Sequence, residues 1–157
     1  MIIKIQIICL GKFKEKAFLE LEREYLKRLG PYAKMKILEI PEIAYKSSAE
    51  IEIVKKKEAA VIRKALPKDA VVILLEEKGV VRDSLDFAEF IGRIGGFGRE
   101  MVFVIGSGVG LDSSLKDIAN HTISLSKLTF THNFARVLLE EQLYRAVCIL
   151  HGKEYHK

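Results

Sequence analysis

The sequence predicts an α/β domain with a mainly parallel sheet of five to six strands flanked by helices. Apolar runs of strand length alternate with longer segments in which apolar residues recur at spacings of three and four, the pattern of successive βα units. No linker, repeat or low-complexity segment divides the 157 residues, so we expect residues 1–157 to form one domain. The predicted strands cover residues 2–10, 35–40, 70–75, 101–105 and 122–125.

The first two predicted helices have clear ends. The first, over residues 15–29, carries an apolar stripe and ends at Gly30-Pro31. The second, over residues 48–66, ends at Pro67, which cannot continue a helix. The stripe of the first helix consists of Phe18, Leu21, Tyr25 and Leu29.

The third and fourth strands, over residues 70–75 and 101–105, are apolar throughout, so we expect them to lie in the centre of the sheet. Further helices are predicted over residues 84–94 and 113–119. The glycine-rich residues 95–98 separate the third helix from the fourth strand.

The last predicted helix, over residues 132–150, is apolar all round its circumference, unlike a lone surface helix. One side can cover the sheet, and the other must be buried by more of the same chain or by a second subunit. Because the protein is small, we favour a dimer. The apolar positions are Phe134, Val137, Leu138, Leu139, Leu143, Ala146, Val147, Ile149 and Leu150.

Composition narrows the class of protein. No apolar run approaches the ~18 residues of a membrane-spanning helix, and the amino terminus lacks the basic leader of a signal peptide, so we expect a cytoplasmic protein that does not enter membranes.

Cys9 and Cys148 lie far apart and fit no metal-ligand spacing, which predicts buried thiols and no metal site. The net charge of +5 and the lysines and arginines of the first half hint at a polyanionic partner, but interleaved glutamates make solvated helix faces the first alternative.

A glycine-rich segment, Gly106 to Asp112, follows the fourth strand. Ligands of open α/β sheets bind outside the carboxyl ends of the strands, so this segment is a candidate nucleotide or nucleoside site, with an ordinary tight turn as the alternative. A dinucleotide fingerprint would be G-x-G-x-x-G on the first βα turn, with an acid about 20 residues later. This chain instead has G-x-G-x-G after the fourth strand, and Ser126 occupies the position about 20 residues later. No phosphate-binding loop of the G-x-x-x-x-G-K-[ST] type occurs, so NAD and ATP are both disfavoured.

Two later segments, residues 123–132 and 151–157, are weaker indicators of a functional site when each is considered alone. The backbone of residues 123–132 could recognise the edge of a base, although a connection in which Thr129 or Thr131 caps the next helix is the simpler interpretation. Residues 151–157 form a short basic and aromatic end, for which fraying is the default.

Taken together in this order, these residues resemble the ribosomal RNA large subunit methyltransferase H family, a compact branch of the SPOUT methyltransferases. The resemblance covers nearly the whole length and is most specific in the second half. Ser107 departs from it, since the family usually has glycine there, and Glu154 stands where many members have proline or another small residue. The matching residues are Leu74-Leu75, Phe103-Val104-Ile105-Gly106, Gly110-Leu111, Ser124-Leu125-Ser126-Lys127-Leu128-Thr129-Phe130, His132, Arg136, Glu141, Leu143-Tyr144-Arg145-Ala146 and Tyr155-His156-Lys157.

The resemblance implies transfer of a methyl group from S-adenosylmethionine to N3 of a pseudouridine in helix 69 of 23S ribosomal RNA, in the 50S subunit or the 70S ribosome. It also implies a carboxyl-terminal trefoil knot, one of the rare exceptions to the rule against threaded chains, and a homodimer. The implied cofactor-binding residues are Leu75, Gly106, Leu125, Ser126, Lys127, Leu128, Thr129 and Phe130.

Methyl transfer from a sulfonium needs no metal, so alignment of the nucleophile and removal of its proton remain for the protein. We expect His132 or His156 to act as the base, with Tyr155 beside His156 and the tail reaching the pocket of a second subunit. Arg136 and Arg145 are candidate RNA or cofactor contacts and Lys157 a candidate RNA contact, although an ion pair between Arg136 and Glu140 has about equal standing.

Two other classes of function stay open. A small dinucleotide-dependent oxidoreductase would use the same glycine-rich strand end, but the acid for the ribose is missing. A non-catalytic ribosome-binding module would use the basic helices alone and would have no cofactor pocket.

Overall fold

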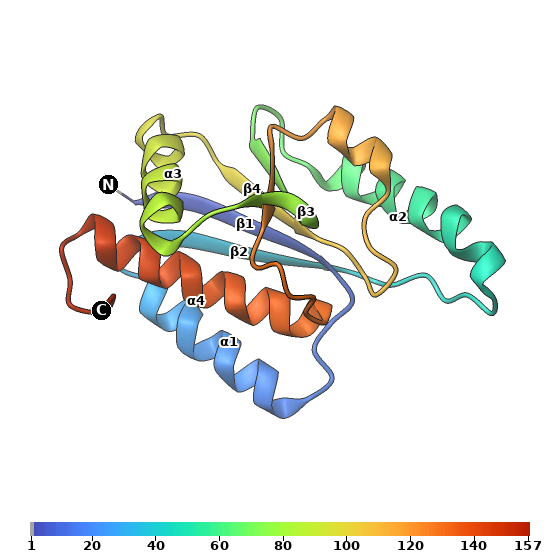
Figure 1. Cartoon of the computed structure of the whole chain (residues 1–157), viewed down its shortest axis with the longest axis horizontal. Coiled ribbons are helices and arrows are strands. Elements are labelled where there is room, and N and C mark those ends of the chain that lie inside the picture. The colour runs from blue at the N-terminus through green and yellow to red at the C-terminus, as the bar shows by residue number, and fades with distance from the viewer. Residues whose placement is uncertain (1) are drawn as a thin grey trace.

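The computed structural model describes residues 2–157 and contains one parallel sheet (Figure 1). Its five strands lie in the order β2-β1-β4-β3-β5, and every neighbouring pair is parallel. The predicted α/β class is confirmed with five strands. The strands are β1 (Ile3–Leu10), β2 (Ala33–Ile40), β3 (Val71–Val81), β4 (Met101–Ile105) and β5 (His121–Ser124).

Helices cover both faces of this sheet. α1 (Lys16–Leu29), α3 (Ser84–Gly96) and α4 (His132–Leu150) pack on one face, whereas α2 (Ile51–Ala65) packs on the other (Figure 1). A 3-10 turn, η1 (Ser48–Glu50), leads into α2. None of the helices in the described part of the chain is long and apolar enough to span a membrane.

Burial on both faces explains why the inner strands are apolar throughout. In β4, Met101 and Phe103 contribute to the core beneath α1, α3 and α4, whereas Val102 and Val104 contribute to the core beneath α2. All four are completely buried. The predicted central position is confirmed for β4, which has two strands on each side, and β3 is also an interior strand.

The prediction of an α-helix over residues 113–119 is wrong. This segment is a short 3-10 helix, η2 (Ser113–Asp117), whose amino end is capped by the Asp112 carboxylate. The Leu115 carbonyl accepts hydrogen bonds from both Ile118 and Ala119, which closes the turn. Residue 121 already belongs to β5, so the connection is too short for an α-helix to develop.

The chain itself covers most of α4. This helix lies between α1 and α3 and on the sheet, and its inward residues are buried (Figure 1). Burial by the same chain, one of the two explanations for its all-round apolar surface, therefore accounts for most of the pattern. An outward strip remains partly accessible, including Phe134, which is 54% exposed, and Leu138.

Strand β3 continues past the predicted end at residue 75. Residues 76–79 leave the ladder as a bulge, and Val80 then pairs with Ile123, the same β5 residue that Leu75 faces. The polar residues of the bulge explain why the apolar pattern alone predicted an earlier end. A Cβ at Gly79 would lie 2.5 Å from the Ile123 carbonyl carbon, so the bulge requires glycine at this position.

We expect Gly79→Ala to lower the free energy of unfolding by roughly 1–3 kcal/mol, because the added methyl group must push β5 away. Gly96→Ala is the matched control, since nothing lies within 4 Å of its Cβ position. Urea denaturation measures both variants. Equal stability of the two would contradict the assignment of close packing to Gly79.

Candidate functional site

A cavity of about 810 Å³ opens at the carboxyl ends of β3, β4 and β5. Three segments far apart in the sequence form most of its wall: residues 75–78, 105–111 and 124–132. Lys116 and Ala135 complete it. The volume is in the range of small-molecule sites, and the location is where open α/β sheets bind ligands.

Most residues predicted to bind the cofactor line this cavity. Lys127 is the exception, since it is exposed and is not one of the lining residues, whereas its neighbours Ser126 and Leu128 are. Sequence reasoning missed Glu76, Glu77 and Lys78, which lie in the bulge that the apolar pattern did not predict. The predicted residues that do line the cavity are Leu75, Gly106, Leu125, Ser126, Leu128, Thr129 and Phe130.

The glycine-rich wall is a closed turn. The Gly110 amide donates to the Ser107 carbonyl at 2.9 Å, and Gly110 has a φ of +81°. A Cβ at Gly106 would lie 3.0 Å from the Gly110 carbonyl carbon. A side chain at position 106 would therefore crowd the backbone of the turn. Asp112 caps the following η2, and the Ser114 hydroxyl and amide lower the pKa of its carboxyl group.

The second wall, residues 124–131, is shaped by its own hydroxyl groups. The Ser124 hydroxyl donates to the Ser126 carbonyl at 2.7 Å, and the Ser126 hydroxyl accepts from the Leu128 amide at 3.0 Å. Thr131 caps α4 by accepting from the Phe134 amide, so of the two threonines considered as caps Thr131 has this role. These bonds fix the loop and leave the Leu128 side chain 72% exposed at the cavity.

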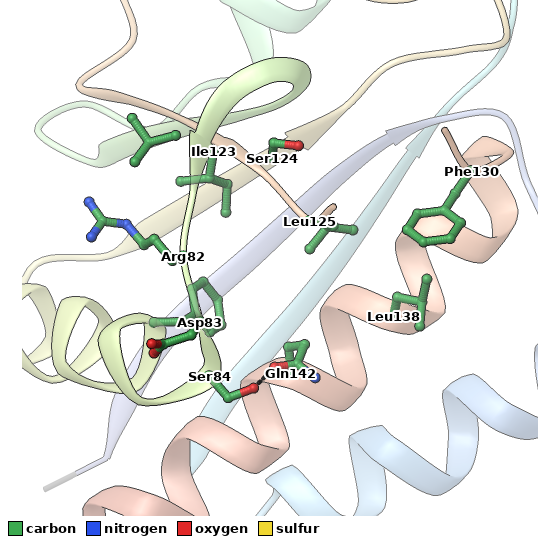
Figure 2. A pocket seen from close by; sticks show the side chains of 11 residues that line it. Arg82, Asp83, Ser84, Ile123, Ser124, Leu125, Phe130, Leu138 and Gln142 are labelled. Carbon is green, nitrogen blue, oxygen red and sulfur yellow. Dashed lines mark hydrogen bonds between the residues drawn. The ribbon is translucent and has the colours of Figure 1, made fainter. Parts of the chain in front are cut away.

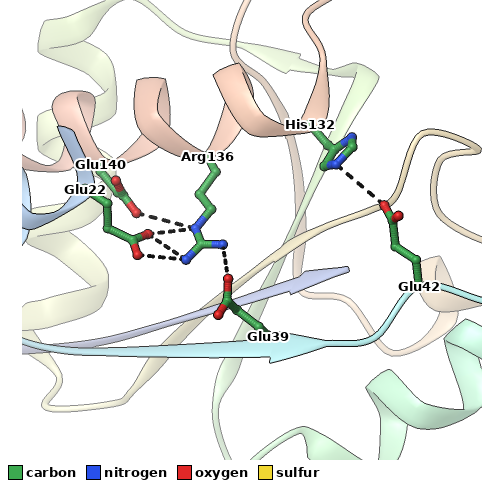
Figure 3. A network of polar contacts seen from close by, with 6 residues as sticks. All are labelled: Glu22, Glu39, Glu42, His132, Arg136 and Glu140. Carbon is green, nitrogen blue, oxygen red and sulfur yellow. Dashed lines mark hydrogen bonds and ion pairs between the residues drawn. The ribbon is translucent and has the colours of Figure 1, made fainter. Parts of the chain in front are cut away.

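Charged groups lie at the edge of the cavity. Lys116 Nζ is 3.4 Å from a Glu76 carboxylate oxygen, and both residues line the wall. His132 Nε2 lies 3.5 Å from a carboxylate oxygen of Glu42, in the segment that follows β2 (Figure 3). The predicted base His132 is thus at the cavity with a carboxylate that can orient its ring.

A smaller hollow of about 340 Å³ adjoins the first and shares Ser124, Leu125 and Phe130 with it (Figure 2). The start of α3 and the outward strip of α4 close it, with the Ser84 hydroxyl donating to the Gln142 side-chain oxygen at 3.0 Å. No sequence motif pointed to this hollow, because its walls come from elements that are joined only by the tertiary fold.

Arg136 does not face the cavity. Its guanidinium group is buried, lies 2.7 Å from Glu22 and 2.8 Å from Glu39, and lies over the Phe13 ring at 4.0 Å (Figure 3). Glu140, four residues later, is 3.8 Å away. The structure therefore favours an ion-pair role for Arg136, but with Glu22 and Glu39 as the close partners instead of the predicted Glu140. It disfavours the expected contact with RNA or cofactor, because the side chain is only 4% exposed.

Glu140 is completely buried, and neither carboxylate oxygen has a hydrogen-bond partner among the described residues. Burial first, and then the nearby Glu22 carboxylate, raise the pKa of Glu140 to about 10, while Arg136 opposes the shift. Burial likewise raises the pKa of the Cys9 thiol to about 12. Both groups are neutral at pH 7, which makes Cys9 an unreactive thiol.

The carboxyl-terminal tail, residues 151–157, packs on α4. The expectation that this segment frays is therefore not met. The Tyr155 hydroxyl donates to Glu141 at 3.0 Å, and its ring packs edge-on against Tyr144. Arg145 pairs with Glu141 at 2.5 Å, lies over the Tyr155 ring at 4.7 Å and is 3.3 Å from His156 Nδ1. Burial, and then hydrogen bonding to Glu141, raise the pKa of Tyr155.

Within one chain the predicted site residues therefore form two groups. His132 is at the first turn of α4, beside the cavity, whereas Tyr155 and His156 contact Glu141 and Arg145, in the middle and second half of this helix. Arg145 follows His132 by 13 residues, which corresponds to about 20 Å along the helix axis. Lys157 is exposed at the end of the tail.

Comparison of the sequence with known proteins finds methyltransferases, both by family profile and by individual relatives. A profile described as "Predicted SPOUT methyltransferase" matches residues 3–156. A protein named "Ribosomal RNA large subunit methyltransferase H" from Desulforamulus reducens is 42% identical over 159 aligned residues, which cover 99% of this chain and 99% of that protein. Proteins of the same name from Listeria monocytogenes serotype 4a and Caldicellulosiruptor saccharolyticus are 42% and 40% identical, over 98% of this chain and 99% of each relative.

The buried cluster around Arg136 makes stability depend on pH. Because the pKa of Glu140 is raised on folding, the folded state holds a proton that the unfolded state releases, so Glu140 costs stability increasingly as the pH rises above its unfolded pKa toward about 10. We expect Glu140→Gln to match the wild type near pH 5 and to gain up to roughly 1.4 kcal/mol per pH unit above it. Urea denaturation at pH 5, 7 and 9 tests this. A difference between variant and wild type that does not change with pH would contradict it.

Arg136→Met removes the cation and leaves Glu22 and Glu39 facing Glu140. We expect a loss of roughly 3–5 kcal/mol at pH 7, the usual consequence of leaving buried charge without its partner. The loss should shrink at pH 5, where the carboxylates can be protonated. Arg145→Met, on the more exposed side of α4, is the control and should change the free energy of unfolding by less than about 1 kcal/mol.

Proposed function

Because this chain belongs to the SPOUT methyltransferase family, we propose that it transfers a methyl group from S-adenosylmethionine to N3 of a pseudouridine in helix 69 of 23S ribosomal RNA. The relatives that it matches over their full length are named as large-subunit ribosomal RNA methyltransferases. The observation that carries the proposal is the meeting of three separate segments in one cavity, since the resemblance assigned residues of all three to the methyl donor. A ribosomal substrate makes the cytoplasm the place of action.

The lining of the cavity fits this donor. Leu75, Leu125 and Leu128 offer apolar surface for an adenine ring, and the turns at Gly106 and Ser126 offer backbone groups for its polar edge. When bound, S-adenosylmethionine supplies a methyl group on an already activated sulfonium, so no metal is needed. A cavity of this kind also favours an enzyme over a non-catalytic ribosome-binding module.

The protein must then align the pseudouridine and accept its N3 proton. His132 is the base candidate at the cavity, and the Glu42 carboxylate at 3.5 Å favours the tautomer that leaves the other ring nitrogen free to accept. His156 is the other candidate, with Tyr155 able to stack on a base and Lys157 able to contact phosphate.

His156 lies 3.3 Å from Arg145, in the second half of α4, and does not line the cavity of its own chain, so it would act from a second subunit. Two copies of α4 packed antiparallel through their outward strips would bring each tail to the cavity of the other copy. Large apolar residues exposed near the cavity, including Leu128 at 72%, Val80 at 53% and Phe134 at 54%, offer surface for such contact. We therefore propose a homodimer with shared sites, together with the trefoil knot that the family implies.

The primary test is methyl transfer from labelled S-adenosylmethionine to 70S ribosomes, 50S subunits and free 23S RNA that lack the modification, followed by mass spectrometry of helix 69. Calorimetric titration should show binding of S-adenosylmethionine and not of NAD or ATP, and light scattering should give the mass of a dimer. Binding of NAD alone would favour the oxidoreductase alternative. RNA binding without methyl transfer would favour the non-catalytic module.

Mixing two inactive variants tests the shared site. We expect His132→Ala and His156→Ala each to lower the rate by about 10²-fold or more if the residue is the base or holds the base in place. In a mixed dimer, one of the two sites combines an intact cavity with an intact tail, so random mixing should restore about one quarter of the wild-type activity. No restoration would overturn the shared site, and full activity of both single variants would exclude both histidines as the base.

A further inference from the structure

Glu58 is a buried carboxylate behind the cavity. It lies on α2 and is only 4% exposed, although carboxylates on surface helices normally face water. One of its oxygens accepts a hydrogen bond from the Ser107 hydroxyl at 3.0 Å, and the other accepts from the Ile43 amide at 3.3 Å. Among the described residues no Lys, Arg or His side chain lies within 4.0 Å of this carboxylate. The Ser107 hydroxyl and the Ile43 amide are therefore its hydrogen-bond donors.

One donor lies in the cavity wall, and the other lies next to a residue that contacts the wall. Ser107 is part of the glycine-rich wall. Ile43 follows Glu42, whose carboxylate lies beside His132 (Figure 3). Glu58 itself does not line the cavity, so any influence on a ligand passes through these two segments.

The turn from Gly106 to Gly110 is flexible by composition, so a contact that anchors it affects the shape of the cavity wall. Gly106, Gly108 and Gly110 give it unusual conformational freedom, and nothing lies within 4 Å of the Cβ positions of Gly108 and Gly110. Ordering a flexible wall at the moment of binding lowers affinity, whereas a wall ordered in advance does not carry this cost. The hydrogen bond from Ser107 connects this turn to α2, a regular helix packed on the sheet.

We propose that Glu58 is a positioning residue of the cofactor site: through the Ser107 hydroxyl it orders the turn from Gly106 to Gly110 and thereby raises the affinity for S-adenosylmethionine. The inference rests on the function proposed above. It also gives Ser107 a role that glycine could not fulfil, because the contact is made by the side chain.

The test compares Glu58→Ala, Ser107→Ala, the double variant and Glu58→Gln. We expect each alanine variant to raise the dissociation constant of S-adenosylmethionine about tenfold, and the double variant to be no weaker than Glu58→Ala, because both remove the same contact. Glu58→Gln should keep wild-type affinity, since its amide can donate to the Ser107 hydroxyl and accept from the Ile43 amide.

Val54→Ala is the matched control, because Val54 is equally buried on α2 but belongs to neither contact. It should lower stability and leave the affinity unchanged. Hydrogen exchange of the amides of residues 106–111 without ligand gives a second readout, which should be faster in both alanine variants and unchanged in Val54→Ala.

Unchanged exchange in the alanine variants, or additive effects in the double variant, would overturn the positioning role even if the wild type binds S-adenosylmethionine. Failure of the wild type to bind S-adenosylmethionine would instead overturn the proposed function and, with it, the role in cofactor binding. Faster exchange together with weaker binding supports the inference.

Discussion

Burial of the parallel sheet on both faces is the constraint on which the rest of the molecule depends. Because helices cover both sides, β4 is buried and apolar throughout, and in β1 only Lys4 faces solvent. Polar groups that bind or react must then collect where the strands end. The cavity lies at that edge, bounded by the bulge after Leu75, the turn after Ile105 and the loop after Ser124.

The same constraint decides how much of the fold could be predicted. Continuous apolar runs and helical stripes are local signals, so the five strands and the helices α1, α2, α3 and α4 were predicted within a few residues of their bounds, except at the carboxyl end of β3. The prediction was wrong where a long-range contact decides the structure. The polar residues 76–79 stay within β3 because Val80 pairs again with β5, and residues 113–117 form only a 3-10 helix because β5 begins soon afterwards.

The candidate site shows the same limit. The resemblance identified residues that do line the cavity, because those segments are continuous motifs in the sequence. The resemblance could not predict that Arg136 pairs with Glu22 and Glu39, because these glutamates are more than 95 residues away along the chain. Nor could it show that the Tyr155 hydroxyl binds Glu141 of the same chain, in the middle of α4 and away from His132.

Two buried glutamates, on opposite faces of the sheet, show how similar burial can go with different roles. Glu140 is enclosed by α1, β2 and α4 without a hydrogen-bond donor, so burial raises its pKa until the carboxyl group is neutral. A neutral group without directed partners can fill space in a cluster, but it holds no segment in place. Glu58 is nearly as buried, yet it accepts from a side chain and from a backbone amide of two different segments. Directed hydrogen bonds of this kind fix the positions of their donors, so the carboxylate that can shape the cavity is the one behind its wall, on the face of the sheet opposite the ion-pair cluster.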